Sequence, residues 1–150
     1  MSELAILLDT YGKSHQNRQN QVIHKICVPL IEWSLLGLLW SLPHPDFFGS
    51  LTWAHLLTAF SIGYYLRFKN WKVMVWSLLM LAPFWIWVSF RPSRLLEISA
   101  GVFALAWIGQ FYGHILERKR PSFMQDLFFL LVGPLWVGET LLRRFHKSLL

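Results

Sequence analysis

The sequence predicts an all-α, polytopic membrane helix bundle. Apolar residues make up 55% of the chain, against about 45–50% in an ordinary soluble domain. Two stretches, Val73–Phe90 and Ile98–Leu116, contain no Lys, Arg, Asp or Glu, and charge-free apolar runs of about 18 residues are typical of transmembrane helices. Basic residues gather in short clusters at the ends of these stretches, as in membrane proteins. We expect one domain, residues 1–150, with an N-terminal segment 1–25, a helical bundle 26–142 and a basic tail 143–150.

The N-terminal segment is predicted to contain a short helix over Glu3–Gly12, a turn, and a new helix from about Asn20. Asn17 and Asn20 are both residues that favour helix N-caps. The segment lacks the apolar core and small-residue cleavage site of a signal peptide, so we expect none.

Four spans are expected in the bundle: Ile26–Leu42, Leu51–Leu66, Val73–Phe90 and Ile98–Leu116. The first is the weakest because it contains an acid, Glu32. An ionisable residue inside a span is by default a functional candidate. Its position near the cytoplasmic side equally allows snorkelling or ion pairing, so we do not place Glu32 among the metal ligands.

The last apolar segment, Phe123–Leu142, is predicted to be re-entrant or interfacial. With a cytoplasmic N-terminus, the Lys and Arg residues flanking the four spans divide nine to two in favour of the cytoplasmic side, which supports this orientation. A fifth crossing would change the division to nine against five, whereas a returning segment gives twelve against two. We expect Gly133–Pro134 to break the helix, because proline removes a donor and clashes with the preceding turn.

The four expected spans lie between His24 and His114, which stands at the end of the last one. Because four is an even number, both histidines are expected on one membrane face. On a helix His114 shares a face with Gln110 and Glu117. Gly109 and Gly113 form a small-xxx-small pair that lets a second helix approach closely.

The N-terminal histidines share a site only if the chain bends. On a straight helix His24 lies on one face with Asn17 and Asn20, while His15 points to the opposite side. The predicted turn would let His15 fold back towards His24.

The polar residues then predict a metal site at the cytoplasmic edge. Three imidazoles with carboxylates suit Fe(II), Zn or Mn, and hydrogen bonds from neighbouring polar groups orient such ligands. Helix capping and interfacial hydrogen bonding are the alternative interpretation. The candidate ligands are His15, His24, His114, Glu117 and Glu139, and the residues expected to orient them are Tyr11, Asn17, Asn20 and Gln110.

Other features indicate no further site. His44, His55 and His146 are interpreted as structural, and a lone cysteine, Cys27, excludes an intrachain disulfide. The net charge of +6 does not predict nucleic-acid binding, because no basic groove with interleaved aromatic residues is present.

Two separated motifs resemble those of the membrane 2-hydroxy-fatty-acid dioxygenase family. "YGKSHQNRQNQVIHKICVP" is similar to the family's opening pattern Tyr-x3-His-x-Asn-x2-Asn-x3-His followed by an apolar pair and proline. A second pattern is matched by Gln110, Gly113, His114, Glu117 and Pro121, and a third by Pro134 and Glu139. The chain departs at Arg18, where a proline is frequent, and at Leu116, where an aromatic residue is frequent.

This resemblance implies an Fe(II)-dependent enzyme that uses O2 to shorten a 2-hydroxy fatty acid by one carbon, an α-oxidation. It implies iron ligands at His15, His24 and His114; a catalytic or ligand role for Glu117, and a ligand role for Glu139, are our own hypotheses. Arg118, Lys119 and Arg120 are candidates to attract the substrate carboxylate, although positive-inside flanking also explains them.

The alternatives are another metal-dependent lipid-modifying enzyme (a hydroxylase or hydrolase) and a non-enzymatic haem- or lipid-binding membrane protein. We expect a multi-pass membrane protein with a cytoplasmic N-terminus, in a bacterial inner membrane rather than the endoplasmic reticulum.

Overall fold

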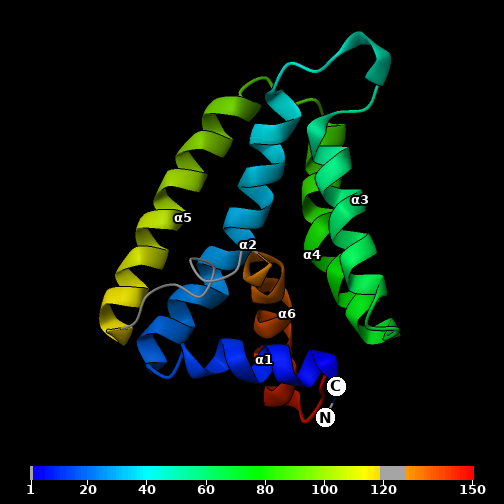
Figure 1. The fold of residues 1–150 in the computed structure, drawn as a ribbon. Helices are drawn as coiled ribbons and strands as arrows, with labels where there is room; N and C mark the ends of the chain where they lie inside the picture. Colours follow the sequence, from blue (N-terminus) through cyan, green and yellow to red (C-terminus); the bar gives the residue numbers. More distant parts are fainter. Residues whose placement is uncertain (1, 119–127) are drawn as a thin grey trace.

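The computed structural model describes residues 2–118 and 128–150, and in these residues the secondary structure is helical, with no strand (Figure 1). The all-α fold class is therefore confirmed. The helices are α1 (Glu3–Lys13), α2 (Arg18–Ser41), α3 (Trp53–Leu66), α4 (Trp71–Ser89), α5 (Leu95–Glu117) and α6 (Phe129–Leu142), with short 3-10 turns η1 (Asp46–Phe48) and η3 (Arg143–Phe145).

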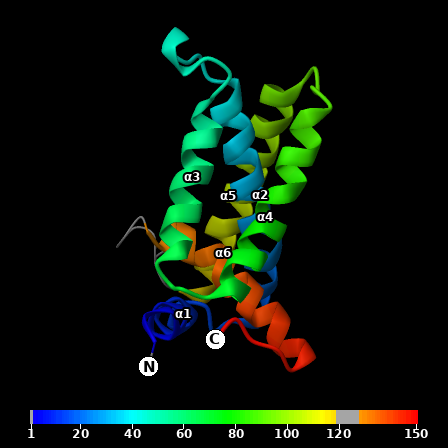
Figure 2. The ribbon, with the colours of Figure 1, turned by 90° about the vertical axis from the view of Figure 1, so that its right-hand side faces the viewer.

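Helices α2, α3, α4 and α5 stand side by side, and α1 lies across one end of this bundle (Figures 1 and 2). Both termini lie at that end, which we call the α1 end. Helix α6 begins beside α3 and crosses the bundle obliquely to the α1 end (Figure 2). The start of α2 and the end of α5 lie beside the last residues of α1, and α6 packs against α1.

Among the described residues, three helices are long and apolar enough to cross a membrane: α2, α4 and α5. Helix α3 has 14 residues and spans about 21 Å, less than the roughly 30 Å hydrocarbon core. The sequence predicted that Leu51–Leu66 also spans the membrane, but the helix in this region begins only at Trp53. The reason is local: Thr52 is extended and forms a capping box with His55, which fixes the helix start.

The predicted division of the N-terminal segment is confirmed. Helix α1 ends at Lys13 and α2 begins at Arg18, two residues before the expected Asn20. Asn17 is the N-cap, and its side-chain oxygen accepts from the backbone N–H groups of Gln19 (2.8 Å) and Asn20 (3.3 Å). A cap at Asn17 forces the bend that precedes α2.

The predicted break at Gly133–Pro134 is wrong, because α6 continues through Pro134. Partners in other helices support the backbone around the proline. Tyr65 Oη donates to the Leu131 carbonyl at 3.0 Å, and Trp76 Nε1 donates to the Pro134 carbonyl at 2.9 Å. Proline at 134 removes the donor to the Leu130 carbonyl, and these two bonds hold the neighbouring backbone in place. Residues 123–127 of the predicted segment lie outside the described residues.

The predicted close packing at Gly109 and Gly113 is confirmed, and it joins α5 to α2. A Cβ atom on Gly109 would lie 2.7 Å from Cys27 Sγ, and one on Gly113 would collide with Asn20 Oδ1. Only glycine permits this approach. The crossing brings the last turn of α5 against the second turn of α2, where His114 and His24 lie.

Candidate metal centre

Three buried histidines converge at the α1 end of the bundle. His15 comes from the turn between α1 and α2, His24 from α2 and His114 from α5. Their ring centroids are separated by 4.2 Å (His15–His24), 4.9 Å (His24–His114) and 5.3 Å (His15–His114). One ring nitrogen of each lies within 4.8 Å of the others, and the side chains are 1%, 1% and 7% exposed. The predicted convergence is confirmed.

Backbone carbonyls set the tautomers of two of these rings. His15 Nδ1 lies 2.7 Å from the Tyr11 carbonyl, and His24 Nδ1 lies 3.1 Å from the Asn20 carbonyl. Since a carbonyl oxygen only accepts, each Nδ1 carries the hydrogen and donates it. Nε2 of each ring is then the nitrogen with a free lone pair. Metal-binding histidines are commonly fixed in this way by a backbone carbonyl.

The atoms around the three rings fit a bound cation. His15 Nε2, His114 Nδ1, Asn20 Oδ1 and Gln110 Oε1 are buried, and none has a hydrogen-bond partner among the described residues. Several unpartnered buried polar atoms in one place are costly. A divalent metal that accepts imidazole nitrogen ligands would satisfy the histidines, and Fe(II) and Zn are such metals.

Electrostatics keep His15 in the form that binds metal. Burial lowers the pKa of His15 below its ordinary value, against the opposing effects of the hydrogen bond to Tyr11 and the charge of Glu117. The ring is therefore neutral at pH 7, as metal coordination requires.

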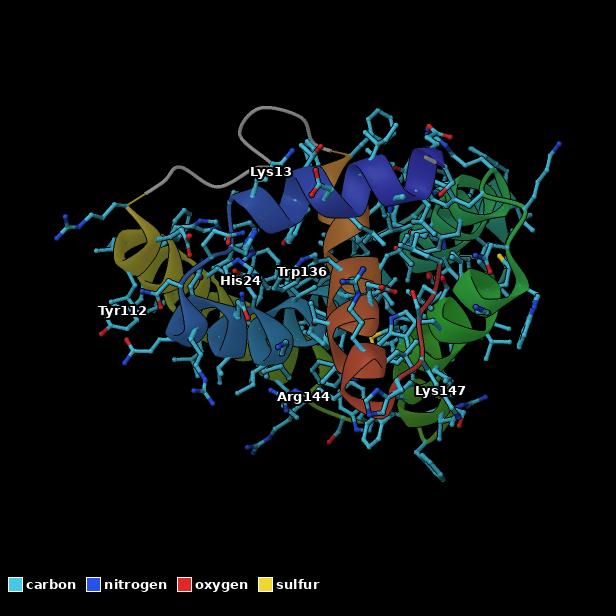
Figure 3. All side chains as sticks on the ribbon, turned by 90° about the horizontal axis from the view of Figure 1, so that it is seen from below. Lys13, His24, Tyr112, Trp136, Arg144 and Lys147 are labelled. Carbon is cyan, nitrogen blue, oxygen red and sulfur yellow. The ribbon has the colours of Figure 1, made fainter. Side chains whose placement is uncertain are left out.

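Aromatic side chains hold His15 from α1 and α6. Tyr11 stacks on the imidazole, with centroids 4.2 Å apart and planes 6° from parallel, and Trp136 lies 5.1 Å from it. Figure 3 labels Trp136 and His24 at this end of the bundle. Tyr11 thus positions His15 with both its ring and its carbonyl, as the sequence predicted in outline. Trp136 was missed, since nothing in its local sequence separates it from the other apolar residues of α6.

Glu117 links α5 to the histidine-bearing turn. Its Oε1 accepts from the Gln16 backbone N–H at 2.7 Å, and its Oε2 accepts from the Asn17 backbone N–H at 2.8 Å and from Asn20 Nδ2 at 3.0 Å. The carboxylate sits at the N-terminus of α2, where the helix dipole favours an anion. The structure does not place its oxygens among the clustered ligand atoms, because three donors already engage both of them.

The structure does not bring Glu139 to the histidines. Its carboxylate accepts from Arg143 Nε (2.6 Å), from Ser148 Oγ (2.8 Å to Oε1) and from the Leu149 backbone N–H (2.7 Å). The residues that follow α6 turn back and supply these donors. Glu139 therefore fastens the end of the chain to α6.

The remaining candidates are distributed around the cluster. Asn17 caps α2, and Gln110 is buried on α5 beside the cavity described below. Arg118 is exposed at the C-cap of α5. Lys119 and Arg120 lie outside the described residues.

An apolar cavity of about 580 Å³ begins at His24 and His114 and extends between α2, α3, α4, α5 and α6. Its volume lies in the range of about 300–1,000 Å³ that is usual for small-molecule sites. Gln110 and Tyr11 border it at the histidine end. Beyond them its walls are mainly aliphatic and aromatic, including Val28, Ile31, Leu35, Phe60, Phe103 and Phe129.

Fold and site together define a class: a helical protein with membrane-length helices, in which a buried three-histidine centre borders an apolar cavity. The chain belongs to the Mpo1-like family, whose model, described as 2-hydroxy-palmitic acid dioxygenase Mpo1-like, matches residues 1–145. A Saccharomyces cerevisiae protein named 2-hydroxy-palmitic acid dioxygenase MPO1 is 30% identical over 127 residues, covering 83% of this chain and 71% of the relative. The resemblance inferred from the motifs is thereby confirmed. No solved structure matches the chain.

Proposed function

We propose that this protein is an Fe(II)-dependent dioxygenase that shortens 2-hydroxy fatty acids by one carbon with O2. Family membership and the name of the yeast relative support a related oxidoreductase activity. The observation that carries the proposal is that His24 and His114 form a polar end of a mainly apolar cavity. Such a cavity suits a ligand with a polar reactive head and a long hydrocarbon tail.

His15, His24 and His114 would hold the iron. When bound, Fe(II) supplies Lewis-acid and redox chemistry at the carboxylate and 2-hydroxyl end of the substrate. The carbonyls of Tyr11 and Asn20 keep the lone pairs of His15 and His24 available for it. Gln110, whose Oε1 has no partner among the described residues, is placed to accept a hydrogen bond from the substrate head.

The apolar walls bind the acyl chain and keep water from the reacting end. Burial of hydrocarbon is worth roughly 0.8 kcal/mol per methylene, so the cavity supplies affinity while the polar end supplies orientation. Glu117 acts in this proposal as a positioning residue, because it fixes the turn that carries His15 to the helix that carries His114. Arg118 remains a candidate to attract the substrate carboxylate from its exposed position.

We further propose that the α1 end faces the cytoplasm and that α3, although short, also crosses the membrane beside α2, α4 and α5. Basic residues support this orientation, because Lys and Arg are more frequent on the cytoplasmic side of membrane proteins. The α1 end has Lys13, Arg18, Arg67, Lys72 and Arg143, and the opposite end has Arg91 and Arg94. The site then lies just inside the cytoplasmic boundary of the lipid. A bacterial inner membrane remains our prediction for the host membrane.

Anaerobic purification tests the proposal. The protein is loaded with Fe(II), given a 2-hydroxy fatty acid and O2, and the product is followed by mass spectrometry. We expect a fatty acid one carbon shorter, formed only with both iron and O2. His114→Ala should abolish the reaction, whereas His146→Asn, a matched change at an exposed histidine outside the cluster, should not. A product with all its carbons retained, or full turnover by His114→Ala, would overturn the proposal.

A further inference from the structure

Glu32 is an acidic group within the wall of the apolar cavity, away from the histidines. It lies on α2 eight residues beyond His24, which is about 12 Å along the helix axis. It borders the same cavity. Its Oε2 has almost no accessible surface and no hydrogen-bond partner among the described residues, so a ligand in the cavity reaches this oxygen only when the side chain turns. The catalytic proposal above makes no use of it.

A carboxyl group at this depth has a high energetic cost. Ionisable residues inside spans are paired or line a polar pathway, and burying a polar group without a partner costs several kcal/mol in an apolar medium. The described residues that line this cavity include no Lys or Arg. The wall therefore contains a strong hydrogen-bonding group that the protein itself leaves incompletely satisfied.

Glu32 does not mark the closed end of the cavity. Leu35, Leu36, Leu57 and Leu81 also line it, at positions one turn farther along α2 and on the facing parts of α3 and α4. A chain bound at the histidines therefore has room to pass Glu32. Ser61 of α3 borders the same cavity, and so does Tyr65, whose hydroxyl already donates to the Leu131 carbonyl.

We propose that Glu32 is a specificity-determining residue that forms, with Ser61, a subsite for a second hydroxyl group in the middle of a long 2-hydroxy acyl chain. This inference rests on the proposed function, because it assumes that the acid head is bound at the histidines. A plain methylene chain passing Glu32 would displace water and leave the carboxyl group unpartnered. A hydroxyl both donates and accepts, so it satisfies the carboxyl group in either protonation state.

The energetic consequence is discrimination between ligands of equal length. Sites built to hydrogen-bond a ligand hydroxyl reject the analogue that lacks it, because their own buried polar groups are left unpaired. For one bond to a group that can relax, we expect about tenfold tighter binding of the dihydroxy acid.

Binding to the full-length, iron-loaded protein in anaerobic detergent solution tests the subsite without relying on turnover. The probes are 2-hydroxyhexadecanoic acid and three dihydroxy acids of the same chain length. Besides the 2-hydroxyl group, these carry a second hydroxyl group near the head, in the middle of the chain, or near the methyl end. Each competes with a fluorescent fatty acid. The variants are Glu32→Leu and Glu32→Gln, with Glu97→Leu as the matched control at an exposed acid on α5.

We expect the wild-type protein and Glu97→Leu to prefer the mid-chain isomer, Glu32→Gln to retain part of that preference, and Glu32→Leu to prefer the plain chain. Equal affinity ratios in wild type and Glu32→Leu would overturn the subsite while leaving the proposed function intact. Failure of all the acids to displace the probe would instead overturn the proposed function, and this inference with it. A Glu32→Leu protein that does not fold leaves Glu32→Gln as the deciding variant, and an unchanged preference there overturns the subsite.

Discussion

Replacing Gly113 with alanine should push α2 and α5 apart where the metal centre is built. The added Cβ would collide with Asn20 Oδ1 and lie 3.4 Å from Asn20 Cγ and 3.5 Å from His24 Cε1. Asn20 is fully buried, and its Nδ2 donates to Glu117. The asparagine cannot move aside without weakening that bond, so the strain falls on the contact between the two helices.

The magnitude follows from a comparison within α5. Overpacking a close contact costs about 1–3 kcal/mol, while a glycine-to-alanine change in a helix gains up to about 1 kcal/mol from propensity. Gly101→Ala supplies the control, since a Cβ there meets nothing within 4 Å. The propensity gain is common to both variants, so Gly113→Ala should be about 1–3 kcal/mol less stable than Gly101→Ala.

The assay is unfolding in mixed micelles by increasing SDS, followed by circular dichroism, with iron per chain measured on the same samples. Gly113→Ala should unfold at lower SDS than Gly101→Ala and retain less iron, because His24 lies on the displaced face. If the two variants unfold together and hold equal iron, the inferred helix contact does not position the site.

Three further predictions concern groups around the histidines. Glu117→Gln should lower stability by about 1–3 kcal/mol, because a charged acceptor of three hydrogen bonds becomes a neutral one, and should weaken iron retention without changing the acyl-chain preference; unaltered iron retention would refute its positioning role. Tyr11→Phe keeps the stacked ring and the carbonyl and should retain iron as wild type does, whereas Tyr11→Ala should release it more readily in a chelator titration; equal release by the two variants would contradict the stacking role. Chelation should lower the thermal unfolding temperature of the wild-type protein, because ligand binding to the native state stabilises it, and the shift should vanish in His24→Ala; an equal shift in that variant would place the metal elsewhere.

The convergence of the histidines was predictable because local chemistry determines it. Asn17 and Asn20 both favour N-caps, which predicted a turn before a helix starting at about Asn20; α2 begins two residues earlier, after Asn17. The glycines of α5 indicated a close helix contact, and the even number of predicted spans between His24 and His114 indicated that both lie at one end. These are properties of short segments, which a single sequence shows directly.

What the sequence alone does not show concerns groups whose partners lie far away in the sequence. Pro134 signalled a break, but Tyr65 and Trp76, from α3 and α4, support the helix across it. Glu117 and Glu139 have the right residue type for metal ligands, yet their donors come from residues 16–20 and 143–149 respectively. Helix α3 is shorter than its apolar run because Thr52 caps it.

The central claim is that His15, His24 and His114 together bind iron, and X-ray absorption at the iron edge tests it most directly. On the anaerobic, iron-loaded protein, the account predicts the multiple-scattering pattern of imidazole ligands, reduced when any one of the three histidines is replaced and unchanged in His146→Asn. An iron spectrum without imidazole scattering, or one that the three replacements leave unaltered, would contradict it.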